Sequence, residues 1–120
     1  MKALSVKQPW AGLIAAGKKT IELRSWRTSH RGPLLIVSSL RPTGEGPTGV
    51  GLCIVDLLDC RPMVIADATA ACSDYDDGIY SWVLGPPKLI VMRPISGRLR
   101  LFEVADELIS TAAVSPSACL

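Results

Sequence analysis

Apolar and polar residues alternate along several short segments of the chain, with Gly- and Pro-rich breaks between them. An alternation with a period of two is typical of β-strands that bury one face. In the first third of the chain it predicts strands over residues 4–6, 20–26 and 34–40. Between the first two, the apolar segment Trp10–Ala16 predicts a short helix, because Pro9 suits a first helical turn and Gly17 suits a C-terminal cap.

The remaining two thirds of the chain continue this pattern. Strands are predicted over residues 50–57, 79–84, 88–95 and 98–104, and a short helix near Val64–Ala71. Many short strands joined by Gly/Pro turns favour a closed or nearly closed barrel. We therefore expect an α+β fold that is mainly β: a mixed β-barrel of about six short strands with one N-terminal helix and a short middle helix.

The length of 120 residues suits a single domain. We expect this domain to cover residues 1–104 and a C-terminal tail to cover residues 105–120. The tail is rich in Ala and Ser and lacks a sustained apolar period. It is therefore predicted to be partly disordered after a helical turn at 106–109.

The composition is that of a globular protein, with 48% hydrophobic and 20% charged residues. No apolar run approaches the roughly 18 residues that cross a bilayer, so we expect no membrane segment. Lys7 and Gln8 follow Lys2 before any apolar h-region can form, so we expect no signal peptide and a cytoplasmic location. None of the four cysteines forms a C-x-x-C pair, which predicts reduced, mostly buried thiols and no metal site.

Charge is distributed unevenly along the chain. Residues 1–41 hold eight basic residues and one acid, a net charge of +7, whereas residues 42–120 hold five basic and ten acidic residues, a net charge of −5. Such a split predicts that one side of the molecule attracts a polyanion and the other repels it. A solvated basic surface without a partner is the alternative that charge alone leaves open.

Two further patterns argue against a cofactor or metal. Gly44, Gly46 and Gly49 match the G-x-G-x-x-G pattern, but a strand is predicted after them where a dinucleotide site needs a helix. Asp74, Asp76 and Asp77 lack the spacing of a calcium-binding loop. We expect no cofactor and no metal.

The segment from Lys19 to Trp26 carries the candidate chemistry. Alternation places on one face of the predicted strand the polar row Thr20, Glu22, Arg24 and Trp26. The other face, Ile21 and Leu23, is expected to pack into the barrel core. Lys19 lies at the head of the row and, with Glu22, is the candidate catalytic residue if the protein is an enzyme.

This row suits a planar ligand with hydrogen-bonding edges, such as a nucleobase. Trp26 offers a stacking surface, Arg24 can bind phosphate or stack, and Glu22 can accept a hydrogen bond from an exocyclic amine. The alternative is that Glu22 and Arg24 form only a surface ion pair and that Trp26 only covers the core.

Further candidates for ligand binding lie near this row in the predicted fold: Gln8, Trp10, Lys18, Arg27, Tyr80 and Ser81. Gln8 is polar where the first strand meets the helix, so it can face the same pocket. Tyr80 and Ser81 begin a strand whose start can reach a cleft. Trp10 is interpreted chiefly as a packing residue.

Three segments together carry a family resemblance: L-S-V-K-Q-P-W at 4–10, G-K-K-T-I-E-L-R-S-W at 17–26 and R-G-P-L-L-I at 31–36. With them the chain resembles the ASCH (activating signal cointegrator homology) domain over roughly residues 3–104. The resemblance implies a PUA-like β-barrel with a cleft beside the first helix. It also implies a module that binds RNA or nucleosides.

One branch of the ASCH family removes the acetyl group from N4-acetylcytidine with a lysine, a threonine and a later glutamate. The lysine corresponds to Lys19, whereas the position of the threonine holds Glu22 here. Ribonuclease activity, again involving the motif lysine, is attributed to other members.

Three functions follow from the residues and the resemblance together. The first is a module that binds RNA, single-stranded nucleic acid or a nucleoside. The second is a hydrolase in which Lys19 acts as base or nucleophile and Glu22 as proton shuttle. The third is a protein-interaction domain, whose sign is an exposed apolar patch away from Lys19. No pattern in the chain indicates an oligomeric state.

Overall fold

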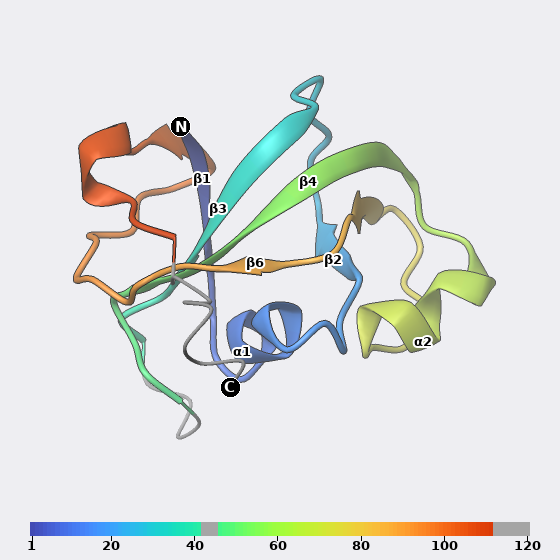
Figure 1. The fold of residues 1–120 in the computed structure, drawn as a ribbon. Helices are drawn as coiled ribbons and strands as arrows, with labels where there is room; N and C mark the ends of the chain where they lie inside the picture. Colours follow the sequence, from blue (N-terminus) through green and yellow to red (C-terminus); the bar gives the residue numbers. More distant parts are fainter. Residues whose placement is uncertain (42–45, 112–120) are drawn as a thin grey trace.

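The computed structural model describes residues 1–41 and 46–111. Its strands are β1 (Lys2–Val6), β2 (Ile21–Arg24), β3 (Gly32–Ser38), β4 (Gly51–Pro62), β5 (Tyr80–Leu84), β6 (Lys88–Leu89) and β7 (Leu101–Glu103). Its helices are α1 (Trp10–Ala15) and α2 (Ala68–Ala71), with 3-10 turns η1 (Ile65–Asp67) and η2 (Asp106–Leu108). Figure 1 shows both helices below β3 and β4.

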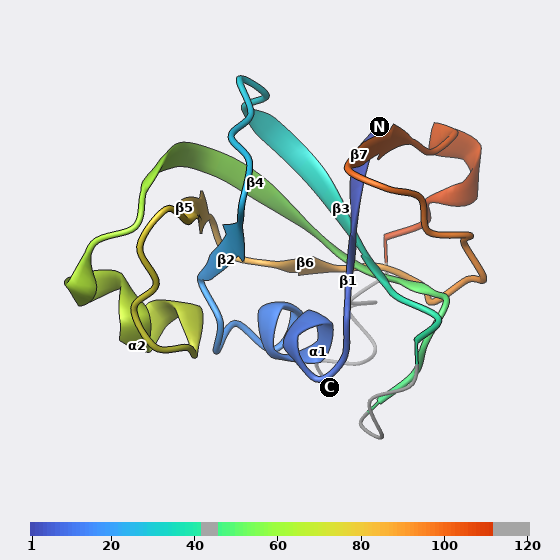
Figure 2. The same ribbon diagram turned by 180° about the vertical axis from the view of Figure 1, so that it is seen from behind.

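The described strands form one mixed sheet in the order β2-β5-β4-β3-β1-β7, with β6 paired to β4. The pairing of β1 with β3 is parallel, and the other pairings are antiparallel. The sheet curls into a half-barrel whose path ends at β2 and β7 (Figures 1 and 2). This architecture confirms the predicted α+β, mainly β fold.

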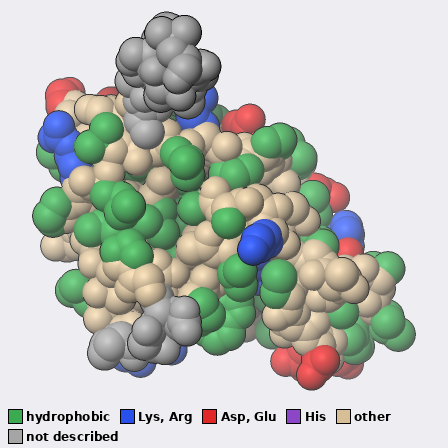
Figure 3. Space-filling model, turned by 60° about the horizontal axis from the view of Figure 1, so that its bottom comes forward, with side chains coloured by type: hydrophobic (Ala, Val, Ile, Leu, Met, Phe, Trp, Pro, Cys, Tyr) green, Lys and Arg blue, Asp and Glu red, His purple; other side chains and the backbone are tan. Residues whose placement is uncertain are grey.

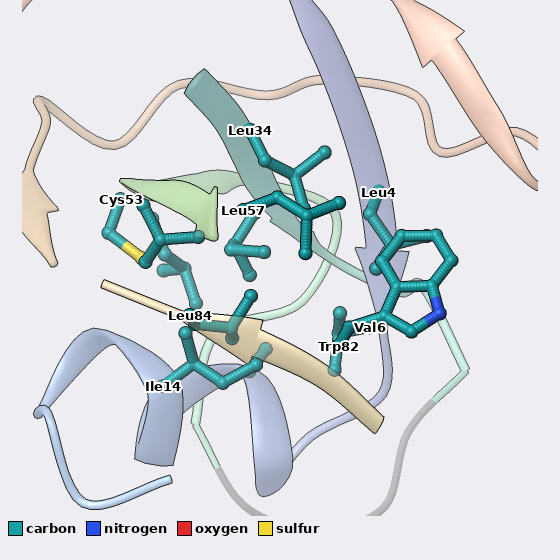
Figure 4. Packing of buried hydrophobic residues seen from close by; sticks show 12 residues of the cluster. Leu4, Val6, Ile14, Leu34, Cys53, Leu57, Trp82 and Leu84 are labelled. Carbon is teal, nitrogen blue, oxygen red and sulfur yellow. The ribbon is translucent and has the colours of Figure 1, made fainter. Parts of the chain in front are cut away.

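The main hydrophobic core fills the inside of the half-barrel. Strand residues such as Leu4, Leu34 and Trp82 are fully buried there, and α1 closes the core with Ala11 and Ile14. Figure 4 shows these side chains converging from several strands and from α1. The helix ends as predicted, because Gly17 adopts a φ of 75°, which a residue with a side chain rarely takes.

The expected orientation of β2 was wrong. Its apolar residues Ile21 and Leu23 pack outside the main core, in a small cluster with Met63 and the buried Ala71 of α2. Glu22 lies directly opposite Trp82 in the antiparallel pairing, and directly opposite residues share a face. The polar face of β2 therefore points to the inside of the half-barrel, because α2 covers the apolar face from outside.

The last two predicted strands are shorter than expected. Instead of residues 88–95, β6 covers only Lys88–Leu89, and Pro94, which lacks an N–H, forms only an isolated bridge. Instead of residues 98–104, β7 starts at Leu101. Arg100 has a φ of 59°, in the left-handed region, so the strand cannot extend through it.

The chain beyond β7 continues along the domain. After η2, Ile109 packs against a second cluster of buried residues, and Ser110 O accepts a hydrogen bond from the N–H of Val91. Of the predicted tail, residues 105–120, the part from 112 to 120 lies outside the described residues. The partial disorder of the tail and its boundary at residue 104 stay predictions. Within the described residues, no helix is both long enough and apolar enough to span a bilayer.

The described cysteines are unpaired thiols with different exposures: Cys53 is buried, Cys60 is half-buried and Cys72 is exposed. The expectation of mostly buried thiols therefore applies to Cys53 but not to Cys72. The acidic residues of the 74–77 segment are exposed. Figure 3 shows one group of acidic side chains at the lower right, on the α2 side of the molecule, and others along its upper edge.

Candidate nucleic-acid interface

A cleft of about 890 Å³ opens between β1 and β2. Ser5 and Val6 line it from β1, and Glu22 and Arg24 line it from β2. Its remaining walls come from the start of α1 and from the segments 39–41, 72–73 and 97–100. Pockets that bind small ligands have volumes of about 300–1,000 Å³. The cleft is therefore large enough for a ligand, and it lies where the sheet leaves β2 without a second neighbour.

The deepest charged groups of the cleft form the cluster Lys19–Glu22–Arg24. The side chains of Lys19 and Glu22 are only 3% and 8% exposed, and Lys19 Nζ lies 3.5 Å from Glu22 Oε1. Arg24 Nη2 and Nε donate to Glu22 Oε2 at 2.7 and 3.1 Å. Lys19 Nζ also donates to the carbonyl of Ala71 at the end of α2. One carboxylate thus balances two cations, which leaves the floor of the cleft with one net positive charge.

Arg24 also connects the two strands that border the cleft. Its Nη2 donates to the carbonyl oxygen of Ser5 at 2.9 Å. Ser5 lies beyond the end of the β1–β7 pairing, which runs from Lys2 to Leu4 of β1. The Arg24 side chain therefore satisfies a strand-edge carbonyl that β7 does not reach.

The lining of the cleft is strongly cationic. It includes one carboxylate, Glu22, and six cationic side chains, for a net charge of +5: Lys7, Lys19, Arg24, Arg41, Arg98 and Arg100. Four of these cations come from segments outside β2 and the turn before it. Low-dielectric walls lined by one sign of charge concentrate the field, so the cleft attracts anions.

Trp26 lies at the edge of the cleft between two neighbours. Its ring meets Trp82 edge to face, with centroids 4.8 Å apart. The guanidinium carbon of Arg100 lies over the ring, 4.3 Å from its centroid. Trp82 Nε1 donates to the carbonyl of Trp26 at 3.3 Å. The predicted stacking surface thus lines the cleft, but Arg100 covers one side of it.

The structure separates the other predicted ligand-binding residues. Trp10, which is 40% exposed, lines the cleft. Lys18 is exposed and is not among the lining residues. The guanidinium of Arg27 lies 5.9 Å from the ring centroid of Tyr80, and neither residue lines the cleft.

Gln8 holds α1 to the loop before β4. It is 1% exposed, its Oε1 accepts from the N–H of Gly12 at 2.8 Å, and its Nε2 donates to the carbonyl of Pro47 at 2.8 Å. These contacts give Gln8 a clear structural role beside the cleft, and it is not among the lining residues.

Ser81 belongs to a buried network on the outer side of the sheet. Its Oγ donates to Asp67 Oδ2 at 2.8 Å, and Asp67 accepts from Arg61 Nη1 and Nη2 at 2.7 and 2.8 Å. These Arg61 hydrogen bonds, together with those from the Val64 N–H and Ser81, hold the pKa of Asp67 far below its ordinary value, although burial opposes the shift. The network fixes β4 and β5 to η1 and leaves Ser81 outside the cleft lining.

Several lining residues were not singled out in the sequence: Ser5, Lys7, Arg41, Arg98, Leu99 and Arg100. A signal for part of this set exists, because Arg98 and Arg100 form a close basic pair in the acidic part of the chain. Their place at the cleft depends on the fold, which brings the segment before β7 next to the end of β1. Within the described residues, no three His, Cys, Asp or Glu side chains lie close enough to hold a metal ion.

Comparisons with known proteins identify relatives of this chain. The family model described as ASCH domain matches residues 4–84. Activating signal cointegrator 1 from Homo sapiens is 30% identical over 130 aligned positions, which take in 88% of this chain and 22% of the relative. The Mus musculus protein of the same name is 29% identical with the same coverage. The chain thus spans about a fifth of the length of these curated relatives.

Solved structures give the same picture of the fold. The crystal structure of ASCH from Zymomonas mobilis has a TM-score of 0.69 and 15% identity, covering 92% of this chain and 96% of that one. A variant of that protein gives a TM-score of 0.63 at 14% identity, covering 88% and 91%. The likeness to these structures supports the curled-sheet fold, and the family match covers well over half of the chain. This chain belongs to the ASCH domain family.

Proposed function

We propose that this ASCH domain binds RNA, with a nucleotide or short single strand held in the cleft between β1 and β2. The observation that carries the proposal is the cleft's net charge of +5 beside two tryptophans, Trp10 and Trp26. Cationic grooves with aromatic side chains are the usual means of holding single-stranded nucleic acid, because phosphates meet the cations and bases stack on the rings.

The cations divide into two groups by burial. Lys19 is buried and paired, so it acts mainly through the positive charge of the cleft floor. Arg41, Arg98 and Arg100 are exposed at the rim, where they can reach successive phosphates without giving up a buried partner. In this proposal the exposed arginines at the rim bind phosphates. The floor of the cleft, around Lys19, contacts the part of the nucleotide that enters the cleft.

Fluorescence anisotropy with a labelled oligouridine of about ten nucleotides tests the proposal. For single strands the slope of log K against log salt is about −0.7 per phosphate contact. We expect a slope between about −2 and −4, and a reduction of about 0.7 in each of the variants Arg98→Ala and Arg100→Ala.

Arg93→Ala is the matched control, because Arg93 is exposed but does not line the cleft. It is expected to leave the salt slope within about 0.3 of the wild-type value. Binding that does not change with salt, or equal effects of all three arginine variants, contradicts the proposal.

Hydrolysis of RNA or of a modified nucleoside is the second candidate function. The observation that favours it is the Lys19–Glu22 pair, because both side chains line the cleft with 3.5 Å between Nζ and Oε1. A lysine and a carboxylate at this distance can exchange a proton, as a base and its shuttle require. Incubation with N4-acetylcytidine, and separately with RNA, tests this function. Turnover that does not exceed that of Lys19→Ala rejects it.

The protein-interaction function stays a prediction. Leu58, Val64 and Ile65 are exposed apolar residues on β4 and around η1 and are not cleft-lining residues. Nothing in the described part of the chain indicates which protein would bind these side chains. RNA binding is therefore the function that the geometry supports best.

A further inference from the structure

The free edge of β2 presents main-chain groups whose direction follows from the strand pairing. The N–H of Leu84 donates to the carbonyl of Thr20 at 2.9 Å, and Glu22 lies opposite Trp82. Hydrogen-bonded pairs recur at every second residue in an antiparallel ladder, so the main chain of Glu22 faces β5. The N–H and C=O of Leu23, one residue further, therefore face away from β5.

This edge opens into the cleft. Leu23 and Ser25 line the cleft together with Glu22 and Arg24, whose side chains lie on the inner face of β2. Cys72, which follows α2, also lines the cleft. Outside the β2–β5 ladder, the main chain of Leu23 makes no hydrogen bond with the described residues. The main chain of Leu23 thus offers a ligand in the cleft one donor, its N–H, and one acceptor, its C=O, both held in place by the strand.

The neighbouring carboxylate is already engaged. Both oxygens of Glu22 are held, Oε2 by two nitrogens of Arg24 and Oε1 by Lys19. A base that bonded to Glu22 would compete with these ion pairs, whereas the main chain of Leu23 needs only to lose water. The group best placed to meet the edge of a base is therefore the main chain next to Glu22, not the Glu22 side chain.

We propose that the main-chain N–H and C=O of Leu23 hydrogen-bond to the Watson–Crick edge of an unpaired nucleobase in the cleft. The inference rests on the proposed RNA-binding function and names the group that selects single strands at that site. Each of the four bases carries a donor beside an acceptor on this edge, so the contact accepts any base whose edge is free. A base in a duplex has its edge occupied and is rejected.

An added peptide strand is the other ligand that a free sheet edge can take. The Arg24 side chain argues against it, because its bond to Ser5 O spans the space between β2 and β1. A strand inserted there needs about 4.8 Å on each side and would displace that bond. A base meets the edge of β2 at one residue and leaves the Arg24–Ser5 bond in place.

The experiment combines a change in the protein with a change in the ligand. Replacing the Glu22–Leu23 amide by an ester removes the Leu23 N–H and leaves the side chain unchanged. Replacing uridine by N3-methyluridine blocks the Watson–Crick edge and leaves every phosphate unchanged. Anisotropy titrations of both proteins with both oligonucleotides form a double-mutant cycle.

Each single change is expected to weaken binding about 3- to 10-fold, the range of one neutral hydrogen bond. The double change is expected to weaken binding no more than the larger single change, because the methyl group already keeps the base edge away from the N–H that the ester removes. Leu23→Pro removes the same N–H by ordinary mutagenesis, which an edge position tolerates, and Leu23→Ala is its matched control.

The proposed Leu23 contact is contradicted if the losses of affinity caused by the ester and by N3-methyluridine multiply in the double change. It is also contradicted if the ester protein binds oligouridine as tightly as the unmodified protein. An extended peptide that competes with oligouridine and loses affinity in the ester protein overturns it in favour of strand addition. If the unmodified protein binds no oligonucleotide, the proposed function fails first. If it binds with the expected salt slope but the cycle shows no coupling, only the Leu23 inference fails.

Discussion

The guanidinium carbon of Arg100 lies over the ring of Trp26, 4.3 Å from the ring centroid, although the backbone of Arg100 is in the left-handed region with a φ of 59°. A residue with a Cβ pays about 1 kcal/mol or more for this conformation. A cation–π contact with an indole stabilises the fold by about 0.5–1 kcal/mol at an exposed site. The two terms are of similar size, so the contact offsets most of the strain at the cleft rim.

The strain can be separated from the contact by two substitutions at Arg100. Arg100→Gly and Arg100→Ala both lose the stacking on Trp26, but only glycine adopts the positive φ without cost. We expect the glycine variant to be more stable than the alanine variant by about 1 kcal/mol in urea-induced unfolding. Equal stabilities, or a more stable alanine variant, contradict a strained Arg100.

The alternation in β2 could be predicted, but the face that lines the interior could not. A period of two correctly groups Glu22 with Arg24 and Ile21 with Leu23. The alternation does not say which group faces the interior of the barrel when other elements pack against both faces of the strand. On β2 the apolar face packs against Ala71 of α2, outside the main core. No local sequence pattern links α2 to β2, because the two elements are far apart in the chain.

The cleft itself is a long-range feature for the same reason. Lys19, Glu22 and Arg24 are near in sequence and could be grouped in advance. Ser5 and Arg100 reach the same cleft only because β1 pairs with β7, which brings the preceding segment alongside. Conversely, Tyr80 and Ser81 were grouped with the cleft residues but line other parts of the molecule. Tyr80 packs against the main core and Ser81 faces the Asp67 network, because adjacent strand residues point to opposite faces.

The Lys19–Glu22–Arg24 cluster predicts an order of stabilities. Glu22→Gln leaves two cations without their carboxylate, one of them on a side chain only 3% exposed. Breaking a buried pair in this way costs about 3–5 kcal/mol. Lys19→Met leaves Glu22 paired with Arg24 and fills the same space, so we expect a cost of less than about 2 kcal/mol. Denaturant titration measures both, and a more harmful Lys19→Met contradicts the view that Glu22 is the shared partner.

The thiols are expected to react in order of exposure. Burial raises the pKa of Cys53 to about 12, so this thiol stays protonated at neutral pH and is shielded from reagents. Cys72 is exposed at the end of α2. With iodoacetamide at about pH 8, mass spectrometry of peptides should show Cys72 modified first and Cys53 modified only after unfolding. Modification of Cys53 at the rate of Cys72 in the folded protein contradicts this order.

The Asp67 network predicts how stability depends on acid. The hydrogen bonds from Arg61 are the main cause that lowers the pKa of Asp67 in the folded state. A carboxyl with a lowered pKa stabilises the fold above its ordinary pKa of about 3.9, and this contribution is lost as the pH falls toward the folded value. Stability is therefore expected to fall below about pH 4, by up to about 1.4 kcal/mol per pH unit from this group.

Asp67→Asn tests whether the Asp67 carboxyl causes the loss of stability in acid. Asp74→Asn, on an exposed loop, is the matched control. At pH 7 the Asp67 variant should be less stable by about 3 kcal/mol, because Arg61 and Ser81 lose a charged acceptor on a side chain that is 6% exposed. Below about pH 4 its free energy of unfolding should fall less steeply than that of the wild type, since the proton-linked contribution is gone. The control should keep the wild-type slope. Parallel acid profiles for the wild type and Asp67→Asn mean that other carboxyl groups cause the acid sensitivity, and the network is then only a packing feature.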